Sequence, residues 1–264
     1  MSDHVIVSEK KALECKTLSY SAWRSYLECP CKYLIYKTQK LPAPTKEMQA
    51  GLKMHSSVET GLKSHTFTDK IFDRDLLTFL RNNILGTKEL KYIPSDTVFT
   101  AEDFLTFKNK ERLPKLAIEA DIRHLHAKVL DCAITGRMDI VCVRNDRFVI
   151  CDWKKSRYVT DENQIVYYAL AIRLAIAADP ELDKIFGHYG FTGYLYYFEH
   201  SHKSAPWIAF NIYTDQMRDQ YRWIAKTIKE IRSLKTLEAT PDTKKCGMCQ
   251  FYPCQEWVKE VVEI

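Results

Sequence analysis

The sequence predicts a protein of the α/β or α+β class, in which a mixed β-sheet is flanked by helices. Two observations carry this prediction. Short apolar runs with the composition of strands follow one another between residues 116 and 153 and recur at 189–198 and 207–213. Segments with the helical repeat of apolar residues lie before, between and after these runs. This arrangement is typical of a sheet whose faces are covered by helices.

The predicted helices are segments whose apolar residues recur with the helical period: 18–36, 45–63, 73–83, 164–178 and 216–234. The first has Ser19 or Ser21 as a candidate N-cap and is interrupted by Pro30, which lacks the backbone N–H that a helix needs. The predicted strands are runs rich in Ile, Val, Phe and Cys or Tyr: 116–123, 129–134, 137–143, 147–153, 189–198 and 207–213. We expect the first four to be successive strands of an antiparallel meander.

Three charged residues lie inside two strongly apolar strands, where burying charge is costly. A two-residue loop at Asn145-Asp146 would set Asp139 directly opposite Asp152. Opposed residues of an antiparallel pair have Cβ atoms roughly 5 Å apart, and like charges there repel. Lys154 lies two residues beyond Asp152 and therefore on the same face. Two carboxylates favour Mg²⁺ or Mn²⁺ between them, with the ammonium group placed to hold a water or a phosphate oxygen.

A lone D-x-K pattern is more often a strand end in solvent with an ordinary surface lysine. The second acid at the matching register favours a catalytic site, because charges that cluster at the end of an apolar strand are typical of one.

The composition bounds the class of protein. The chain has 264 residues, 46% of them hydrophobic, which supports a packed core and excludes a disordered chain. Its net charge of +5 is compatible with a polyanionic partner. We expect residues 1–16 to be a polar lead-in and 17–264 to be one domain. The chain lacks an apolar stretch of membrane-spanning length and a secretion signal, so we expect a cytoplasmic protein without a membrane partner.

Nine cysteines, an odd number, fit a reducing compartment better than a disulfide framework. Cys246, Cys249 and Cys254 are closely spaced near the end of the chain, and Cys29 lies at the other end. Four thiolates suit either a structural zinc ion or an iron–sulfur cluster, and their spacing leaves both open. The cysteines within predicted strands are expected to be core residues: Cys132, Cys142 and Cys151.

Four short motifs occur in order along the chain: G-x-x-x-H ending at His55, G-R-M-D ending at Asp139, D-W-K ending at Lys154, and Q-x-x-x-Y ending at Tyr168. In this order they resemble the PD-(D/E)XK nuclease superfamily, specifically its RecB-like branch. That branch includes the CRISPR-associated RecB-like exonucleases and the AddB-type nuclease domains. The resemblance spans about residues 18–257 and implies a restriction-endonuclease-like core. Asp152 stands where many members have Glu, although Asp is also frequent in the RecB-like branch.

The resemblance implies that a divalent ion is bound by His55, Asp139, Asp152 and the backbone carbonyl of Trp153. Lys154 would orient the attacking water or stabilise charge on the phosphate. An imidazole ligand favours Mn²⁺ over Mg²⁺, so activity with Mn²⁺ is expected. Taken alone, His55 would be interpreted as a histidine on a helix surface.

Gln164 and Tyr168 lie one helical turn apart, so both can reach one substrate phosphate or base, and the resemblance implies that they bind DNA. Without the resemblance, core packing with a capping amide explains them equally well. Glu119, in the strand before the hairpin, is a weaker candidate for supporting the site.

The resemblance also favours a 4Fe-4S cluster over zinc, held by Cys29, Cys246, Cys249 and Cys254. Relatives of the AddB and CRISPR-associated kinds hold such a cluster with one early cysteine, in a C-P context after an aromatic helix, and three late ones. Cys31 is the second candidate for the early ligand. The cluster would join residues 17–37 to 240–258 as a helical subdomain, in a structural role.

The function that follows is a metal-dependent deoxyribonuclease. We expect an exonuclease that hydrolyses phosphodiester bonds of single-stranded or end-resected DNA in recombination, repair, or phage or defence DNA processing. Its partners would be DNA ends and single strands, with a separate helicase or recombinase, in the cytoplasm or the host cytoplasm if the chain is viral. The alternative is a non-catalytic DNA-binding scaffold subunit of a helicase–nuclease or recombination complex.

Overall fold

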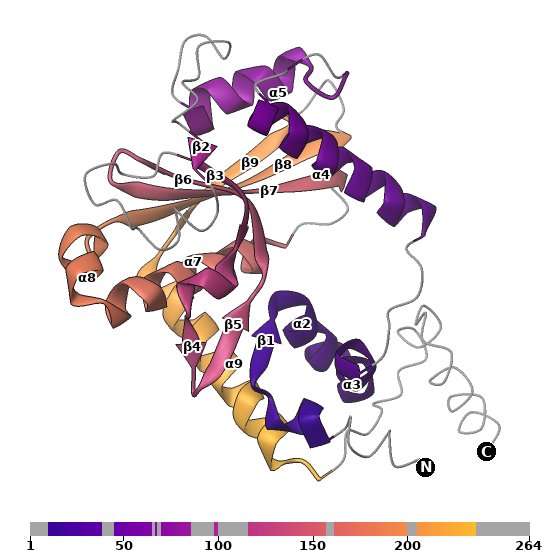
Figure 1. The fold of residues 1–264 in the computed structure, drawn as a ribbon, viewed down its shortest axis with the longest axis vertical. Helices are drawn as coiled ribbons and strands as arrows, with labels where there is room; N and C mark the ends of the chain where they lie inside the picture. The colour runs from indigo at the N-terminus through magenta and orange to yellow at the C-terminus, as the bar shows by residue number, and fades with distance from the viewer. Residues whose placement is uncertain are drawn as a thin grey trace. The chain divides into compact units, whose positions relative to one another are not determined.

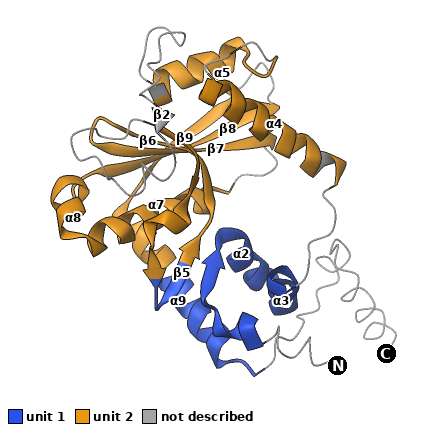
Figure 2. Ribbon diagram, in the orientation of Figure 1, with its two compact units in different colours: residues 1–44, 129–133, 222–264 blue, residues 45–128, 134–221 orange. Residues whose placement is uncertain are grey.

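A computed structural model describes residues 10–38, 45–64, 67, 70–85, 98–99, 116–156, 161–199 and 205–235. The chain forms two compact units, coloured separately in Figure 2. The first comprises residues 1–44, 129–133 and 222–264, and the second comprises residues 45–128 and 134–221.

The second unit is built on a six-stranded mixed sheet with strand order β2-β3-β6-β7-β8-β9. Its strands are β2 (Val98–Phe99), β3 (Leu116–Asp121), β6 (Arg137–Arg144), β7 (Arg147–Ser156), β8 (Gly190–Glu199) and β9 (Trp207–Ile212). Strands β3, β6 and β7 are antiparallel neighbours, and β7 and β8 run parallel. A parallel pair needs a crossover connection, which helix α7 (Glu162–Ala178) supplies. The predicted mixed sheet flanked by helices is confirmed.

Helices cover both faces of this sheet (Figure 1). Helices α4 (Lys46–Ser64) and α5 (Arg74–Phe79) lie over one face, and α7 lies against the other. Helix α5 continues into a π-helical turn, η1 (Leu80–Leu85), where the sequence predicted one helix over 73–83. The remaining helical segments of the unit are η4 (Ile122–Leu125), α8 (Pro180–Phe186) and the first part of α9 (Thr214–Ser233).

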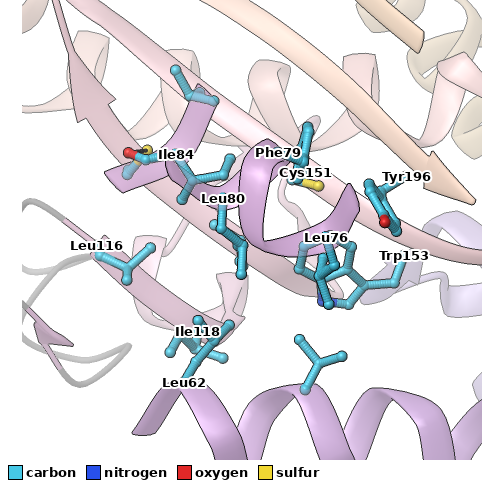
Figure 3. Packing of buried hydrophobic residues seen from close by; sticks show 14 of the residues in the cluster. Leu62, Leu76, Phe79, Leu80, Ile84, Leu116, Ile118, Cys151, Trp153 and Tyr196 are labelled. Carbon is cyan, nitrogen blue, oxygen red and sulfur yellow. Dashed lines mark hydrogen bonds between the residues drawn. The ribbon is translucent and has the colours of Figure 1, made fainter. Parts of the chain in front are cut away.

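The core between the sheet and the α4 and α5 side is apolar and aromatic (Figure 3). Trp153 and Cys151 of β7 point into it, together with Phe79 of α5. Because side chains alternate along a strand, the residue between them, Asp152, faces the opposite side of the sheet. The buried members of this core are Val58, Leu62, Phe72, Leu76, Phe79, Leu80, Ile84, Leu116, Ile118, Ile140, Cys142, Val149, Cys151, Trp153 and Tyr196.

The β6–β7 hairpin has the predicted two-residue loop. Asn145 and Asp146 have φ of 49° and 55°, as a type I′ turn requires, and the flanking Arg144 and Arg147 are paired. The paired ladder runs outward as far as Ile140 and Cys151, so the same register sets Asp139 opposite Asp152 just beyond its end.

The first unit contains two short helices where the sequence predicted one interrupted helix: α2 (Tyr20–Glu28) and α3 (Pro30–Thr38). Ser19 is the N-cap of α2, and its hydroxyl accepts a hydrogen bond from the backbone N–H of Ala22 at 3.2 Å. Between the helices Cys29 is extended, with φ of −167°, because the ring of Pro30 disfavours helical backbone at the preceding residue. Residues 10–14, within the expected lead-in, are helical.

The prediction that residues 129–134 form a strand of the meander is wrong. Leu130 and Asp131 have φ of 49° and 62°, and this two-residue turn divides the run into β4 (Lys128–Val129) and β5 (Cys132–Thr135). These strands belong to a separate three-stranded sheet with order β1-β5-β4, in which β1 spans Thr17–Ser19. The Ala133 N–H donates to the Lys16 carbonyl at 2.8 Å. Among the described residues, no helix is long and apolar enough to cross a membrane.

Candidate active site

The charged residues singled out in the sequence meet at the end of the β6–β7 ladder. Asp139 of β6 and Asp152 of β7 are 7% and 4% exposed. The helices that flank the sheet bring further polar side chains to them: His55 comes from α4, and Gln164 and Tyr168 come from α7.

Asp139 is held from two sides. Its Oδ2 accepts a hydrogen bond from the backbone N–H of Trp153 at 2.6 Å. Its Oδ1 lies 3.2 Å from Nδ1 of His55. A hydrogen bond to a carboxylate is stronger than one between neutral groups, so these two contacts fix the orientation of the carboxylate. The backbone of the D-W-K motif thereby positions the acid of the G-R-M-D motif.

Lys154 begins a chain of contacts that leads into α7. Its ammonium nitrogen lies 2.6 Å from Oδ2 of Asp152 and donates a hydrogen bond to Oε1 of Gln164 at 3.0 Å. The amide nitrogen of Gln164 then donates to the hydroxyl of Tyr168 at 2.8 Å. Tyr168 is 4% exposed, and its ring packs on Gly136, where an added Cβ would lie 3.0 Å from the Cε1 atom. This series of contacts holds Lys154 beside Asp152.

The electrostatics of the site disfavour the charged forms of Asp152 and Glu119. Burial, together with the charge of Asp139, raises the pKa of Asp152 to about 6 and that of Glu119 to about 7. Burial lowers the pKa of His55, but its hydrogen bond to Asp139 and the charge of that acid outweigh burial and raise it. A bound dication would relieve this repulsion, and the carboxyl groups would release protons as it binds.

The donor atoms present fit a divalent ion. One ligand atom each of His55, Glu119 and Asp139 all lie within 4.8 Å of one another. Ligands on opposite sides of an octahedral ion with bonds of about 2.1 Å are about 4 Å apart, so a small closure would bring all three into contact with one ion. The structure thus brings together two of the predicted ligands, His55 and Asp139, with Asp152 on the neighbouring strand.

Glu119, a weaker candidate in the sequence analysis, is one of the three candidate ligands that the structure brings together. It lies in β3 between two residues that pair with β6, Ile118 with Ile140 and Ala120 with Met138, so this register sets it opposite Asp139. Counting the register of β3 against β6 would have found it. Its φ of 53° is unusual for a glutamate within a strand.

The described cysteines of the strands differ in burial from the two candidates for the early cluster ligand. Cys132, Cys142 and Cys151 are buried in strands, which confirms them as core residues. Cys29 and Cys31 are half-buried at the junction of α2 and α3. The three late candidates for cluster ligands, Cys246, Cys249 and Cys254, lie outside the described residues.

The fold and the site together define a class of metal-assisted hydrolase. The fold is a mixed sheet flanked by helices, and the site combines two buried acids and a lysine on adjacent central strands with an imidazole from a covering helix. The family model of the PD-(D/E)XK nuclease superfamily matches residues 17–254. The chain belongs to this superfamily, whose members are nuclease-type hydrolases that use divalent metal ions. A search of curated proteins found no match.

Proposed function

We propose that this protein is a divalent-metal-dependent exonuclease that hydrolyses phosphodiester bonds of single-stranded or end-resected DNA. We place it in recombination, repair, or phage or defence DNA processing, with a separate helicase or recombinase as partner. The observation that carries the nuclease proposal is the contact of half-buried His55 with buried Asp139 beside the Asp152–Lys154 pair, in a member of a nuclease superfamily.

The metal ligands in this proposal are His55, Asp139, Asp152 and the backbone carbonyl of Trp153. When bound, a divalent ion lowers the pKa of a coordinated water and neutralises charge on the scissile phosphate. Asp139, held by His55 and by the Trp153 N–H, keeps its carboxylate aimed at the ion position. The imidazole of His55 favours Mn²⁺ over an ion that prefers only oxygen ligands.

Lys154 is placed to orient the attacking water or to stabilise negative charge on the phosphate. Its ammonium nitrogen is held between Asp152 and Gln164, so one of its three N–H groups is left for a water or a phosphate oxygen. Gln164 and Tyr168 are proposed to bind DNA beside this ammonium group. In the absence of DNA, Gln164 contacts both Tyr168 and Lys154 and so keeps the ammonium group in position.

We also propose that the chain belongs to the RecB-like branch and holds a 4Fe-4S cluster, with Cys29 as the early ligand and Cys246, Cys249 and Cys254 as the late ones. The order of the four motifs supports the branch. Support for the early ligand comes from the position of Cys29, half-buried at the end of α2 and directly before Pro30.

Cleavage of end-labelled linear DNA, compared with closed circular DNA, tests the nuclease proposal. We expect the wild-type protein to degrade the linear form with Mn²⁺ or Mg²⁺ and to be inactive in chelator. Asp152→Ala should abolish cleavage, at least a hundredfold, because it removes a proposed ligand and the ionic partner of Lys154. Asp215→Ala, which removes a carboxylate with 81% exposure on α9, is the matched control and should retain full activity.

Cleavage at the wild-type rate by pure Asp152→Ala protein would contradict the proposal that this site is a nuclease active site. Degradation of circular as well as linear DNA would show an endonuclease in place of an exonuclease. The alternative function, a DNA-binding scaffold, predicts DNA binding without metal-dependent turnover by the wild-type protein. The intact set of His55, Asp139, Asp152 and Lys154 favours the enzyme, because a decayed site is expected to have lost a member.

A further inference from the structure

One cation at the rim of the candidate active site has no role in the proposed chemistry. Arg137 begins β6 and lies two residues before Asp139, so both side chains leave the same face of the strand. The side chain of Arg137 is 63% exposed, in contrast to the buried Asp139. Its guanidinium is therefore open to solvent and lies beside Glu119, one of the candidate metal ligands.

The contact that Arg137 makes is a weak one. Its Nη1 lies 3.7 Å from Oε2 of Glu119, across the β3–β6 pair. A long ion pair whose cation is mostly exposed contributes little free energy, so Arg137 can exchange Glu119 for another partner at small cost. Glu119 is the inner, less exposed member of the pair, with side-chain exposure of 13%.

Glu119 is also a candidate ligand for a divalent ion. Its carboxylate is one of the three groups whose ligand atoms lie within 4.8 Å of one another, with His55 and Asp139. The nearby acids Asp139 and Glu59 repel the Glu119 carboxylate, whereas a dication at this position would draw it toward itself. The same added positive charge would repel the guanidinium of Arg137.

We propose that Arg137 binds a phosphate of the nucleic acid next to the scissile one, and that Glu119 holds its guanidinium until a divalent ion takes the Glu119 carboxylate. This inference rests on the proposed function and deepens it, because it couples substrate binding to metal binding at one site. A guanidinium suits the task, since its planar set of N–H donors matches two phosphate oxygens. Because Arg137 is exposed at the start of the strand that carries Asp139, its guanidinium is accessible to the backbone of a strand bound at the site.

The test measures binding of a fluorescent single-stranded oligonucleotide by anisotropy at several salt concentrations. Chelator prevents cleavage in one series, and a Lys154→Met background prevents it in a second series with Mn²⁺. With Mn²⁺, Arg137→Ala should weaken binding roughly fivefold, a typical upper value for one exposed charged contact. It should also reduce the slope of log affinity against log salt by about 0.7, the value for one phosphate contact to a single strand.

Two further substitutions of Arg137 and one control variant complete this measurement. Arg137→Lys keeps the charge and should keep the salt slope, and Arg137→Gln replaces Arg137→Ala if the latter folds poorly. Arg218→Ala is the matched control, because Arg218 is an arginine of similar exposure, 55%, that pairs with Asp215 on α9. It should leave both affinity and slope unchanged.

Glu119→Gln tests the second half of the proposal. By releasing Arg137 it should tighten DNA binding in chelator about two- to fivefold, toward the value of the Mn²⁺-loaded protein. It should also weaken Mn²⁺ binding, measured by calorimetry without DNA. Glu230→Gln, an equivalent change at an exposed glutamate of α9 that pairs with Lys226, should do neither.

The outcomes separate the inference from the nuclease proposal. An affinity and a salt slope of wild-type size in Arg137→Ala, or no measurable binding by the wild-type protein, overturn the role of Arg137. Unchanged binding in chelator by Glu119→Gln overturns the role of Glu119. A wild-type protein that cleaves no DNA, while Arg137→Ala still lowers the salt slope, overturns the nuclease and leaves Arg137 as a phosphate-binding residue.

Discussion

Two carboxylates buried side by side are the central feature at the scale of single residues. Asp139 and Asp152 are each less than a tenth exposed, and burial together with the charge of Asp139 raises the pKa of Asp152. Such a pair destabilises the metal-free protein unless a cation compensates it. Lys154, 2.6 Å from Asp152, supplies part of this compensation, and the proposed divalent ion would supply the rest.

We expect the stability of the metal-free protein to fall as pH rises through about 6. The pKa of Asp152 is raised from 3.8 to about 6 in the folded state, so between these values the folded protein holds a proton that the unfolded chain has released. Stability from this group is complete below pH 3.8 and lost above about 6, and the loss is at most about 3 kcal/mol. Urea unfolding in chelator between pH 4.5 and 7.5 measures it.

Asp152→Asn is the comparison for this prediction, since the amide cannot titrate. Its free energy of unfolding should depend less on pH over the same range, while the contribution of Glu119 remains in both proteins. Equal pH dependence in the two proteins would contradict the raised pKa of Asp152.

At the scale of secondary-structure elements, the site depends on how α7 packs against the start of β6. Gly136 ends the connection from β5, and the ring of Tyr168 fills the space that a side chain would need. Tyr168 in turn accepts the hydrogen bond of Gln164, which holds Lys154. The close approach of two elements is therefore linked to the position of the proposed catalytic amine.

Gly136→Ala should therefore reduce both stability and cleavage. The new Cβ would lie 3.0 Å from Cε1 of Tyr168, which is closer than normal contact and forces the ring to shift. Overpacking of this kind costs about 1–2 kcal/mol in the free energy of unfolding. Thermal unfolding and the cleavage assay measure the two effects.

Gly51→Ala is the matched control for this substitution. A Cβ at Gly51 meets nothing within 4 Å, and alanine in a helix interior is favoured over glycine by about 0.5–1 kcal/mol. Gly51→Ala should thus be neutral or stabilising. If Gly136→Ala behaved in the same way, the packing of Tyr168 would not matter for the site.

At the scale of the whole molecule, the proposed cluster would tie the two ends of the chain together. Protein purified without oxygen should be brown and contain about four iron atoms per chain, the content of one 4Fe-4S cluster. Cys29→Ser should lose the iron and the colour and be less stable, whereas Cys31→Ser should keep them. Visible absorption and iron analysis provide the measurement.

Other outcomes of that measurement have definite meanings. Colourless protein with one bound zinc would replace the cluster by a structural zinc site. Colour that persists in Cys29→Ser and disappears in Cys31→Ser would make Cys31 the early ligand.

Much of the sheet followed from local patterns in the sequence. The Asn145-Asp146 turn and the apolar strands beside it predicted the β6–β7 hairpin and its register, because two-residue loops allow few geometries. Residues 129–134 were assigned to the wrong sheet, since their composition is that of a strand and only the backbone at Leu130 and Asp131 shows the turn that divides them. Helix α8 was missed because seven residues carry little periodicity.

The residue pattern alone predicted the superfamily and the hairpin register. It therefore also predicted the cluster of Asp139, Asp152 and Lys154, because all three lie within one local hairpin. Strand register places Glu119 opposite Asp139, but the contact of His55 with Asp139 and the distances among all three residues became known only from the folded structure. These contacts join segments far apart along the chain. Their distances are set by how helices and strands pack around a shared core, and no local pattern of residues encodes them.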